Sequence, residues 1–223
     1  MDAEEITISL GEAATVSGLW EAPPGARACL VLAHGAGAGM RHRVMGATAH
    51  GLADRGVATL RYQFPYMEKG GKRVDAPPVA HRTVRAAVAE ARRRAPDLPL
   101  FAGGRSFGGR MTSQAQAIEP LAGVRGLVFF AFPLHPAGKP SDERAKHLDD
   151  VRIPMLFLQG TKDTLADMTL LNGVVKRLGR RATLQLAQEA DHSFHAAAKT
   201  GRKDPEILAA LLDTAAAWMA KTA

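Results

Sequence analysis

The sequence contains very little cysteine: Cys29 is the single cysteine among 223 residues. One cysteine cannot form an intrachain disulfide, which suits a reducing compartment, and its place in the apolar run 28–33 predicts a buried, unreactive thiol. The sequence also lacks a hydrophobic run of membrane-spanning length, and its opening residues do not follow the pattern of a signal peptide. We therefore expect a cytoplasmic protein with no membrane partner.

Internal repeats, low-complexity tracts and known nucleic-acid-binding motifs are missing as well. The net charge is +7, but lysine and arginine are scattered through most segments, which is typical of a solvated basic surface and predicts no nucleic-acid partner. The length suits one domain with a sizeable core, so we expect a single domain over residues 1–223.

Short apolar runs alternate with segments of helical periodicity along most of the chain. Strands are predicted at 6–10, 15–20, 28–33, 57–62, 98–102, 124–130, 153–158 and 183–186, and helices at 41–54, 80–94, 111–118, 165–178 and 205–219. This alternation indicates an α/β fold whose mostly parallel sheet has helices on both faces. The functional site of such a sheet lies in the loops at the carboxyl ends of its strands.

One of these loops contains the pattern G-x-S-x-G, formed by Gly104 to Gly108 with Ser106 at its centre. The pattern lies between a predicted strand and a predicted helix, where a sharp turn can lift a serine hydroxyl above the sheet. Glycines beside the serine allow the strand and the helix to approach closely. Ser106 is therefore the candidate nucleophile.

A serine nucleophile needs a base and an acid that orients the base, and in this topology the chain order is serine, acid, histidine. Asp163 follows the strand 153–158 and is the candidate acid, although it could instead cap the next helix, and Asp167 is the alternative acid. His192 follows the last strand and is the candidate base, with His195 as its rival. Asp191 more plausibly anchors the loop. Because the two histidines lack a third nearby ligand, we predict no metal site.

The developing oxyanion needs two backbone N–H donors. One is expected from Phe107, directly after the serine, and the other from Ala36 in the glycine-rich loop 34–39, with Gly37 as the alternative. That loop has neither the Gly-Lys-Ser/Thr ending of a phosphate loop nor the dinucleotide spacing, so we predict no cofactor. His34, at its start, is expected to be structural.

With these residues in place, the chain resembles the α/β-hydrolase superfamily over nearly its whole length. More narrowly, it is similar to small bacterial hydrolases related to the animal testis-expressed hydrolase-like proteins and an NSL-complex subunit, also grouped with dienelactone-hydrolase-like proteins. The segments that carry this likeness are 32–37, 61–68, 103–110, 158–163 and 190–194. The resemblance implies an eight-stranded sheet with an antiparallel second strand and a Ser106–His192–Asp163 triad. Dienelactone hydrolases have a cysteine nucleophile, so serine at position 106 departs from their pattern.

About twenty residues separate the strand ending near 130 from the one beginning near 153, which leaves room for a loop and one short helix but not for a lid. An open site of this kind could have an apolar acyl-binding wall, and ordinary core packing is the alternative for the same side chains. The candidates for the wall are Tyr62, Phe64, Pro65, Tyr66, Phe132 and Leu134.

These features predict a serine hydrolase that cleaves a small or medium acyl ester or thioester, and an acyl-protein thioesterase is the nearest enzymatic alternative. The partner would be a small-molecule acyl substrate, and the oligomeric state is not predicted. A catalytically silent scaffold is the alternative of a different class. Its acidic partner could bind the basic loop 69–73 or the run 92–94, and the complete triad favours the enzyme.

Overall fold

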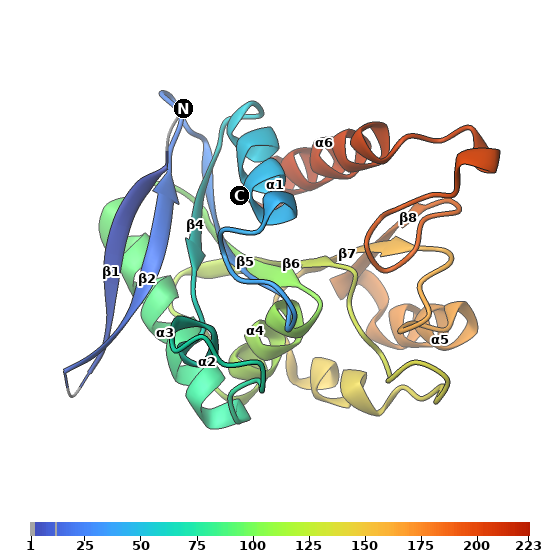
Figure 1. The fold of residues 1–223 in the computed structure, drawn as a ribbon, viewed down its shortest axis with the longest axis horizontal. Helices are drawn as coiled ribbons and strands as arrows, with labels where there is room; N and C mark the ends of the chain where they lie inside the picture. Colours follow the sequence, from blue (N-terminus) through green and yellow to red (C-terminus); the bar gives the residue numbers. More distant parts are fainter. Residues whose placement is uncertain (1–2, 12) are drawn as a thin grey trace.

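All strands of the protein belong to one eight-stranded sheet in the computed structural model, which describes residues 3–11 and 13–223 (Figure 1). The strands are β1 (Glu4–Gly11), β2 (Ala14–Glu21), β3 (Ala28–Ala33), β4 (Val57–Tyr62), β5 (Leu100–Arg105), β6 (Val124–Phe130), β7 (Met155–Gly160) and β8 (Ala182–Ala187). Their order in the sheet is β1-β2-β4-β3-β5-β6-β7-β8. Strand β2 is antiparallel to both of its neighbours and the pairs from β4 to β8 are parallel, as the family resemblance implied.

Helices cover both faces of this sheet (Figure 1). Helices α1 and α6 lie on one face, and α3, α4 and α5 lie on the other, together with the short 3-10 helix η1. Their bounds are α1 (Arg43–Ala53), α2 (Pro65–Glu68), α3 (Pro77–Arg94), α4 (Phe107–Ile118), η1 (Glu143–Asp150), α5 (Met168–Leu178), η2 (Gly179–Arg181), η3 (Ala198–Thr200) and α6 (Asp204–Thr222). No helix in the described residues is long and apolar enough to cross a membrane.

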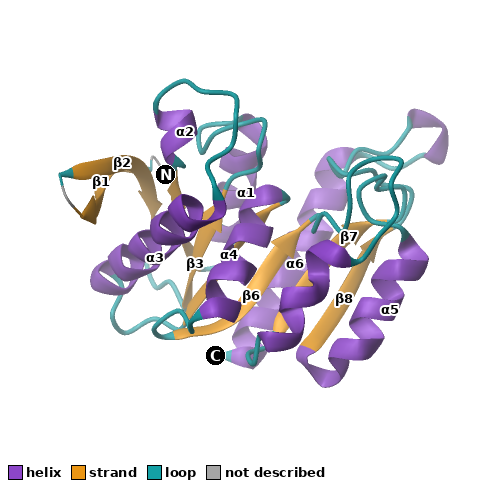
Figure 2. Cartoon of the chain, turned by 90° about the horizontal axis from the view of Figure 1, so that it is seen from below, coloured by secondary structure: helices purple, strands orange, loops and turns teal. Residues whose placement is uncertain are grey.

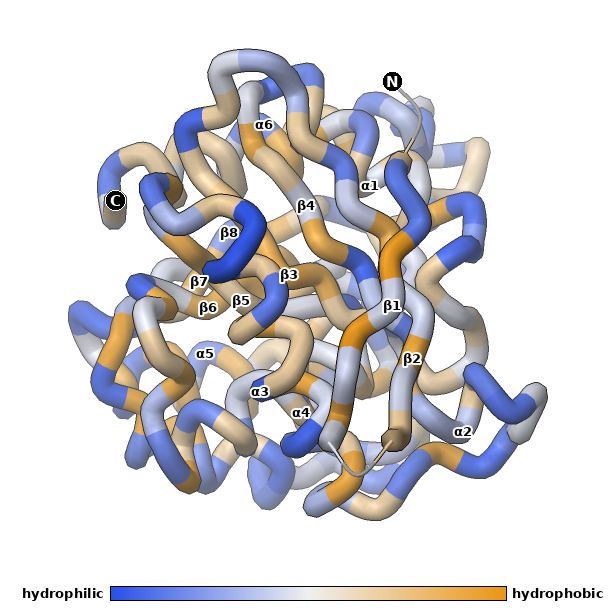
Figure 3. Tube along the Cα trace, turned by 90° about the vertical axis from the view of Figure 1, so that its left-hand side faces the viewer, coloured by the Kyte–Doolittle hydropathy of each residue, from blue (hydrophilic) through white to orange (hydrophobic). Residues whose placement is uncertain are grey.

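The central strands are buried because a helix layer covers each of their faces. Every residue of β3, β4 and β7 is buried, in keeping with their continuous apolar runs. Strand β1, in contrast, alternates between buried and exposed residues in its middle, and the same alternation of hydropathy is visible along β1 in Figure 3. Cys29 is fully buried, and burial raises the pKa of its thiol to about 12, as expected for an unreactive thiol.

Several predicted boundaries are wrong by a few residues: α3 and α4 begin at Pro77 and Phe107 rather than at 80 and 111, and β5 spans Leu100–Arg105 rather than 98–102. Two further differences, on the carboxyl half of the sheet, have a local cause. Strand β7 begins at Met155 rather than 153, after Pro154, which has no N–H to donate to a sheet. Helix α5 begins at Met168 rather than 165, because the Asp167 carboxylate accepts the N–H groups of Thr169 and Leu170 and so caps the helix. Asp167 therefore precedes the helix in which it was expected to lie.

The loops that follow the parallel strands gather at one edge of the sheet, the upper edge in Figure 2. Between β6 and β7 the chain forms a loop and the single short helix η1, so the prediction that no lid is present is confirmed. The candidate residues from the loops after β3, β5, β7 and β8 therefore meet at an open edge.

Candidate active site

Ser106 occupies a sharp turn between the last residue of β5 and the first residue of α4. Its backbone has φ +48° and ψ −116°, a conformation that residues with a Cβ rarely adopt. The turn is held in place because the Ser106 N–H donates to the Phe130 carbonyl at 3.0 Å and its own carbonyl accepts the Arg110 N–H at 3.1 Å. Strain of this kind persists only where the surrounding structure fixes it.

Two glycines of the G-x-S-x-G pattern have no room for a side chain. A Cβ on Gly104 would lie 2.4 Å from the Ala33 carbonyl oxygen, and a Cβ on Gly108 would lie 2.5 Å from the His34 carbonyl oxygen. Gly104 also has a φ of +153°. The turn is thus packed directly against the end of β3, and this close approach explains why glycine is required on both sides of Ser106.

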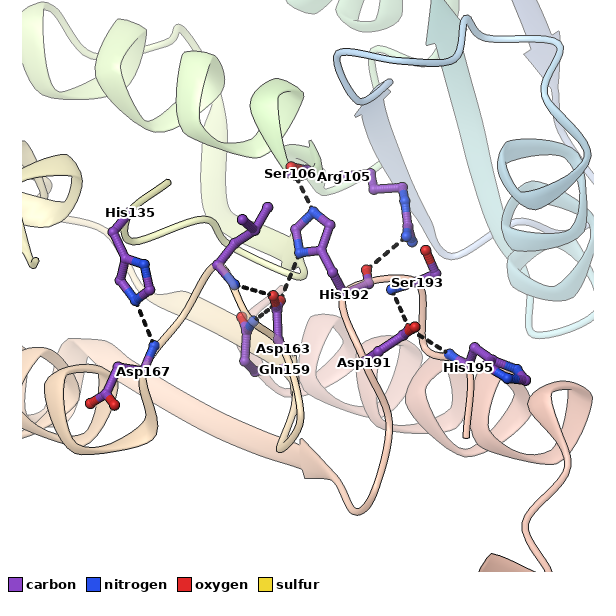
Figure 4. Close-up of polar contacts among 11 residues, drawn as sticks. Arg105, Ser106, His135, Gln159, Asp163, Asp167, Asp191, His192, Ser193 and His195 are labelled. Carbon is purple, nitrogen blue, oxygen red and sulfur yellow. Dashed lines mark hydrogen bonds and ion pairs between the residues drawn. The ribbon is translucent and has the colours of Figure 1, made fainter. Parts of the chain in front are cut away.

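A continuous chain of hydrogen bonds joins Ser106, His192 and Asp163 (Figure 4). The Nε2 atom of His192 lies 2.9 Å from Ser106 Oγ, and its Nδ1 atom lies 2.7 Å from Asp163 Oδ2. Because the carboxylate can only accept, Nδ1 carries the imidazole proton and Nε2 is left to accept the serine proton. The geometry is that of a nucleophile, a base and an orienting acid.

The Asp163 carboxylate is fully buried and has three hydrogen-bond donors. Besides His192, it accepts the Gln159 side-chain amide at 2.6 Å and the Leu165 N–H at 2.8 Å. These three donors hold the carboxylate in place, whereas the His192 side chain remains 24% exposed. Asp163 does not cap a helix, because α5 begins only at Met168.

The structure separates the rival residues from Ser106. His195 points away from Ser106, and its Nδ1 atom pairs with Asp204 Oδ2 at 2.8 Å; this carboxylate raises the pKa of the imidazole. Asp191 accepts the N–H groups of Ser193 and His195, so it anchors the histidine loop as expected (Figure 4).

Asp167, the alternative acid, has other partners: its carboxylate caps α5, and its N–H donates to His135 Nε2 at 2.9 Å.

The two expected oxyanion donors come from the start of α4 and from the loop after β3. Phe107 is the first residue of α4, where an N–H has no partner within the helix. Ala36 lies in the exposed loop after β3, and this loop is close to the serine, since a Cβ on Gly35 would lie 3.8 Å from Ser106 Cβ. Tyr66 Oη donates to the Ala36 carbonyl at 2.9 Å, so the Tyr66 side chain supports this loop. Gly37 is also exposed and stays an alternative donor.

His34 is fully buried and serves as a structural link, as expected. Its Nδ1 atom lies 2.8 Å from the Gly35 carbonyl oxygen, and its Nε2 atom accepts the Phe64 N–H at 3.0 Å. Burial lowers the pKa of His34, so the neutral form that makes both bonds is favoured. His34 thereby fastens the loop after β3 to the loop after β4.

The expected apolar acyl-binding wall is wrong for four of its residues. Tyr62, Phe64, Phe132 and Leu134 are all 0% exposed and belong to the core beneath the site. Tyr62 is the last residue of the buried strand β4, Phe64 packs against the start of α4 with its ring centroid 5.3 Å from that of Phe107, and Phe132 packs on Phe129 of β6 with ring centroids 5.2 Å apart. Tyr66 is 5% exposed and uses its hydroxyl on the Ala36 loop rather than facing a pocket.

Arg105 is a site residue that the sequence pattern did not reveal, because it is an unspecified position of G-x-S-x-G. Its Nη2 atom donates to the His192 carbonyl at 2.8 Å, and its guanidinium lies 5.6 Å from the centre of the Phe194 ring. Burial lowers the pKa of Arg105, while Asp163 and Asp191 oppose that shift. Gln159, which donates to Asp163, was likewise missed because it was assigned to a loop rather than to the end of β7.

The basic run 92–94 is largely paired within the protein. Arg93 and Arg94 both bind Glu90, and Arg94 also binds Glu4. These pairs leave Arg92 as the member of the run for which no ion pair is found in the described residues.

Comparison with known proteins agrees with this fold. The chain belongs to the alpha/beta hydrolase domain family, whose model matches residues 26–220. Among similar solved structures, dienelactone hydrolase from Anabaena variabilis is 20% identical, with a TM-score of 0.77 and coverage of 100% of this chain and 99% of that one.

A serine hydrolase without a lid from Xanthomonas campestris is 21% identical, with a TM-score of 0.74 over 98% of this chain and 95% of that one. The esterase domain of a Rhodothermus marinus protein is 14% identical, with a TM-score of 0.73 over 98% of each chain. At these identities the likeness establishes the fold, and the chemistry must be inferred from the site itself.

Proposed function

We propose that this protein is a serine esterase or thioesterase that cleaves a small or medium acyl group through an acyl-enzyme at Ser106. The observation that supports the proposal most strongly is the unbroken chain of hydrogen bonds from Ser106 Oγ through His192 to Asp163, at a strained turn on the open edge of the sheet. We also infer a cytoplasmic location, in keeping with the single buried thiol.

In the first half of the proposed reaction, Ser106 Oγ bonds to the acyl carbonyl carbon while its proton passes to His192 Nε2. The carbonyl oxygen becomes an oxyanion, which accepts hydrogen bonds from the N–H groups of Phe107 and Ala36. The bond to the leaving group then breaks, and the alkoxide or thiolate takes the proton from His192. Asp163 holds the imidazole and stabilises its protonated form throughout.

In the second half, a water molecule attacks the acyl carbon and gives a proton to His192. The bond to Ser106 Oγ breaks, the serine oxygen recovers its proton from His192, and the carboxylic acid leaves. Because no lid covers the site between β6 and β7, water can reach the acyl-enzyme from the open edge.

The test is labelling by a fluorophosphonate probe, measured as intact mass. Wild type should gain one label, and Ser106→Ala and His192→Ala should gain none, whereas the matched controls Ser193→Ala and His195→Ala should be labelled like wild type. If folded wild type is not labelled, the proposal is wrong and the silent scaffold is favoured; if Ser106→Ala is labelled, the nucleophile is a residue other than Ser106. p-Nitrophenyl esters and acyl thioesters of increasing chain length would next define the acyl group and the leaving group.

A further inference from the structure

Two arginines lie in the first turns of the neighbouring helices α4 and η1. Arg110 is in the first turn of α4, and its N–H donates to the Ser106 carbonyl. Arg144 is the second residue of η1, the yellow helix in Figure 1, and η1 packs against α4. Both helices begin at the carboxyl edge of the sheet, because α4 follows the end of β5 and η1 follows the loop after β6. Their first turns are therefore on the same edge as Ser106.

Neither arginine forms an ion pair with a carboxylate in the described part of the chain. The Nε atom of Arg110 is buried and has no hydrogen-bond partner among the described residues. Burial lowers the pKa of Arg110, and the nearby charge of Arg144 lowers it further. A half-buried guanidinium beside a second one is costly unless an anion accompanies it.

Three of the four carboxylates closest in sequence to Arg144 are already paired with other cations, and the fourth, Asp150, forms no ion pair with either arginine among the described residues. Glu143 binds Lys146, while Asp142 and Asp149 both bind Arg177. Helix α4 has no acidic residue in its first turn, so the positive end of its dipole adds to the charge of Arg110. The two arginines thus form a cationic cluster that the protein itself does not neutralise.

We propose that Arg110 and Arg144 bind an anionic group of the substrate, a carboxylate or a phosphate, beside Ser106. This inference rests on the proposed function, since it assigns the anion to the molecule that Ser106 attacks. Guanidinium groups bind carboxylate and phosphate oxygens through paired N–H donors. The Arg110 N–H donates to the Ser106 carbonyl, so Arg110 lies one turn of chain beyond the serine, and a substrate that extends from Ser106 along α4 toward η1 meets the two arginines.

Binding is tested first without any turnover, in the Ser106→Ala protein. Glutarate and inorganic phosphate are titrated separately while the arginine Nε–H signals are followed by NMR, and the Arg110 signal is identified by its loss in Arg110→Lys. We expect a saturable shift of that signal with at least one anion, and loss of saturable binding in Arg144→Met but not in Arg180→Met, a control on the exposed helix η2. Linear shifts that are equal in all variants would overturn the proposal.

The second test compares substrates that differ in charge. For the acyl side, the p-nitrophenyl monoester of glutaric acid is compared with p-nitrophenyl butyrate; for the leaving-group side, acetyl-CoA is compared with the neutral acetyl thioester of N-acetylcysteamine. We expect the ratio of kcat/KM for the charged over the neutral substrate of one pair to fall about 10- to 100-fold in Arg110→Met and Arg144→Met. Arg180→Met should keep the wild-type ratio.

The pair that responds identifies which side of the substrate carries the charge, and unchanged ratios in both pairs would overturn the proposal. If wild type hydrolyses neither the charged nor the neutral substrates, the proposed function fails, while the NMR titration still tests the anion site by itself.

Discussion

Two serine–histidine pairs lie along α4, one at the residue before the helix and one within it, and they have similar distances but different surroundings. Ser106 Oγ lies 2.9 Å from His192 Nε2 at the start of the helix, and Ser113 Oγ lies 2.7 Å from His147 Nε2 two turns later. The shorter pair is the one buried between α4 and η1. A short serine–histidine distance therefore does not by itself define a nucleophile.

The direction of the hydroxyl proton separates the two pairs. Ser113 Oγ donates to the Arg110 carbonyl at 2.9 Å, so its oxygen accepts from His147 and no base is available to it. His192, in contrast, has Asp163 on its other nitrogen, which leaves Nε2 to accept from Ser106. The carboxylate, the strained turn and the partial exposure are what distinguish the candidate catalytic pair.

The largest expected difference between the pairs is in turnover. Ser106→Ala should lower kcat/KM for p-nitrophenyl butyrate about 1,000-fold or more, because it removes the nucleophile. Ser113→Ala should change kcat/KM less than about threefold, yet lower the free energy of unfolding by about 1–3 kcal/mol, because it breaks a buried hydrogen-bond network. Ester kinetics and urea denaturation of both variants test this double difference, and similar kinetic losses in the two would contradict it.

Replacement of the Asp163 carboxylate is expected to have the next largest effect on turnover. Asp163→Asn should lower kcat about 1,000-fold or more, because an amide can stabilise the wrong imidazole tautomer and cannot support a protonated His192. Asp167→Asn is the matched control, since asparagine can still cap α5, and its kcat should stay within about twofold of wild type. A kcat loss that is larger in Asp167→Asn would show that the acid has been assigned to the wrong residue.

The sequence predicted the parts of the site that depend on chain order. The strands, the G-x-S-x-G turn and the loops that bring Asp163 and His192 to Ser106 follow from periodicity and spacing, and the hydrogen bonds among the three residues match that prediction. Periodicity reports which residues follow a strand, but not whether the loop then turns inward. This is why Phe64 was placed on a wall although it is a core residue, while Tyr62 is buried as the last residue of β4.

Contacts between side chains and distant backbone groups could not be predicted from the sequence. Arg105 binds the carbonyl of His192, 87 residues away, and nothing in the local pattern indicates that bond. The start of α5 was missed for a local reason: Leu165 and Ala166 continue the apolar pattern, but Asp167 caps the helix and fixes its first residue at Met168.

The buried pair should also give the protein a distinctive pH dependence of stability. Burial, then the charges of Arg110 on α4 and His81 on α3, lower the pKa of His147 to about 4, while Asp149 and Asp150 oppose the shift. The unfolded chain binds the proton more readily than the native protein, so stability present above pH 6.5 is lost as the pH falls toward 4.

Between pH 7 and pH 4.5 we expect wild type to lose about 2 kcal/mol more than His147→Gln, which has no proton to gain. Urea denaturation at pH 7, 5.5 and 4.5 measures the difference between the two proteins. Parallel pH profiles would mean that His147 titrates normally and that its burial has no energetic consequence.

The smallest expected effect concerns the loop after β3, which contains Ala36, the expected second oxyanion donor. Tyr66→Phe removes the hydroxyl that holds the Ala36 carbonyl at 2.9 Å, so the Ala36 N–H should be less well aligned with the oxyanion. We expect kcat for p-nitrophenyl butyrate to fall about fivefold with KM nearly unchanged, because the contact matters most when charge develops on the carbonyl oxygen.

Tyr62→Phe removes a hydroxyl that is buried in the core beneath the site and has no hydrogen-bond partner among the described residues, so its kcat should stay within about twofold of wild type. Equal losses of kcat in both variants would indicate general loosening of the core rather than a specific role for Tyr66. A rise in KM at constant kcat in Tyr66→Phe alone would instead mean that Tyr66 contacts the acyl group, as the sequence first suggested. A change in kcat therefore indicates that the Tyr66 hydroxyl supports the oxyanion loop, whereas a change in KM indicates that it binds the substrate.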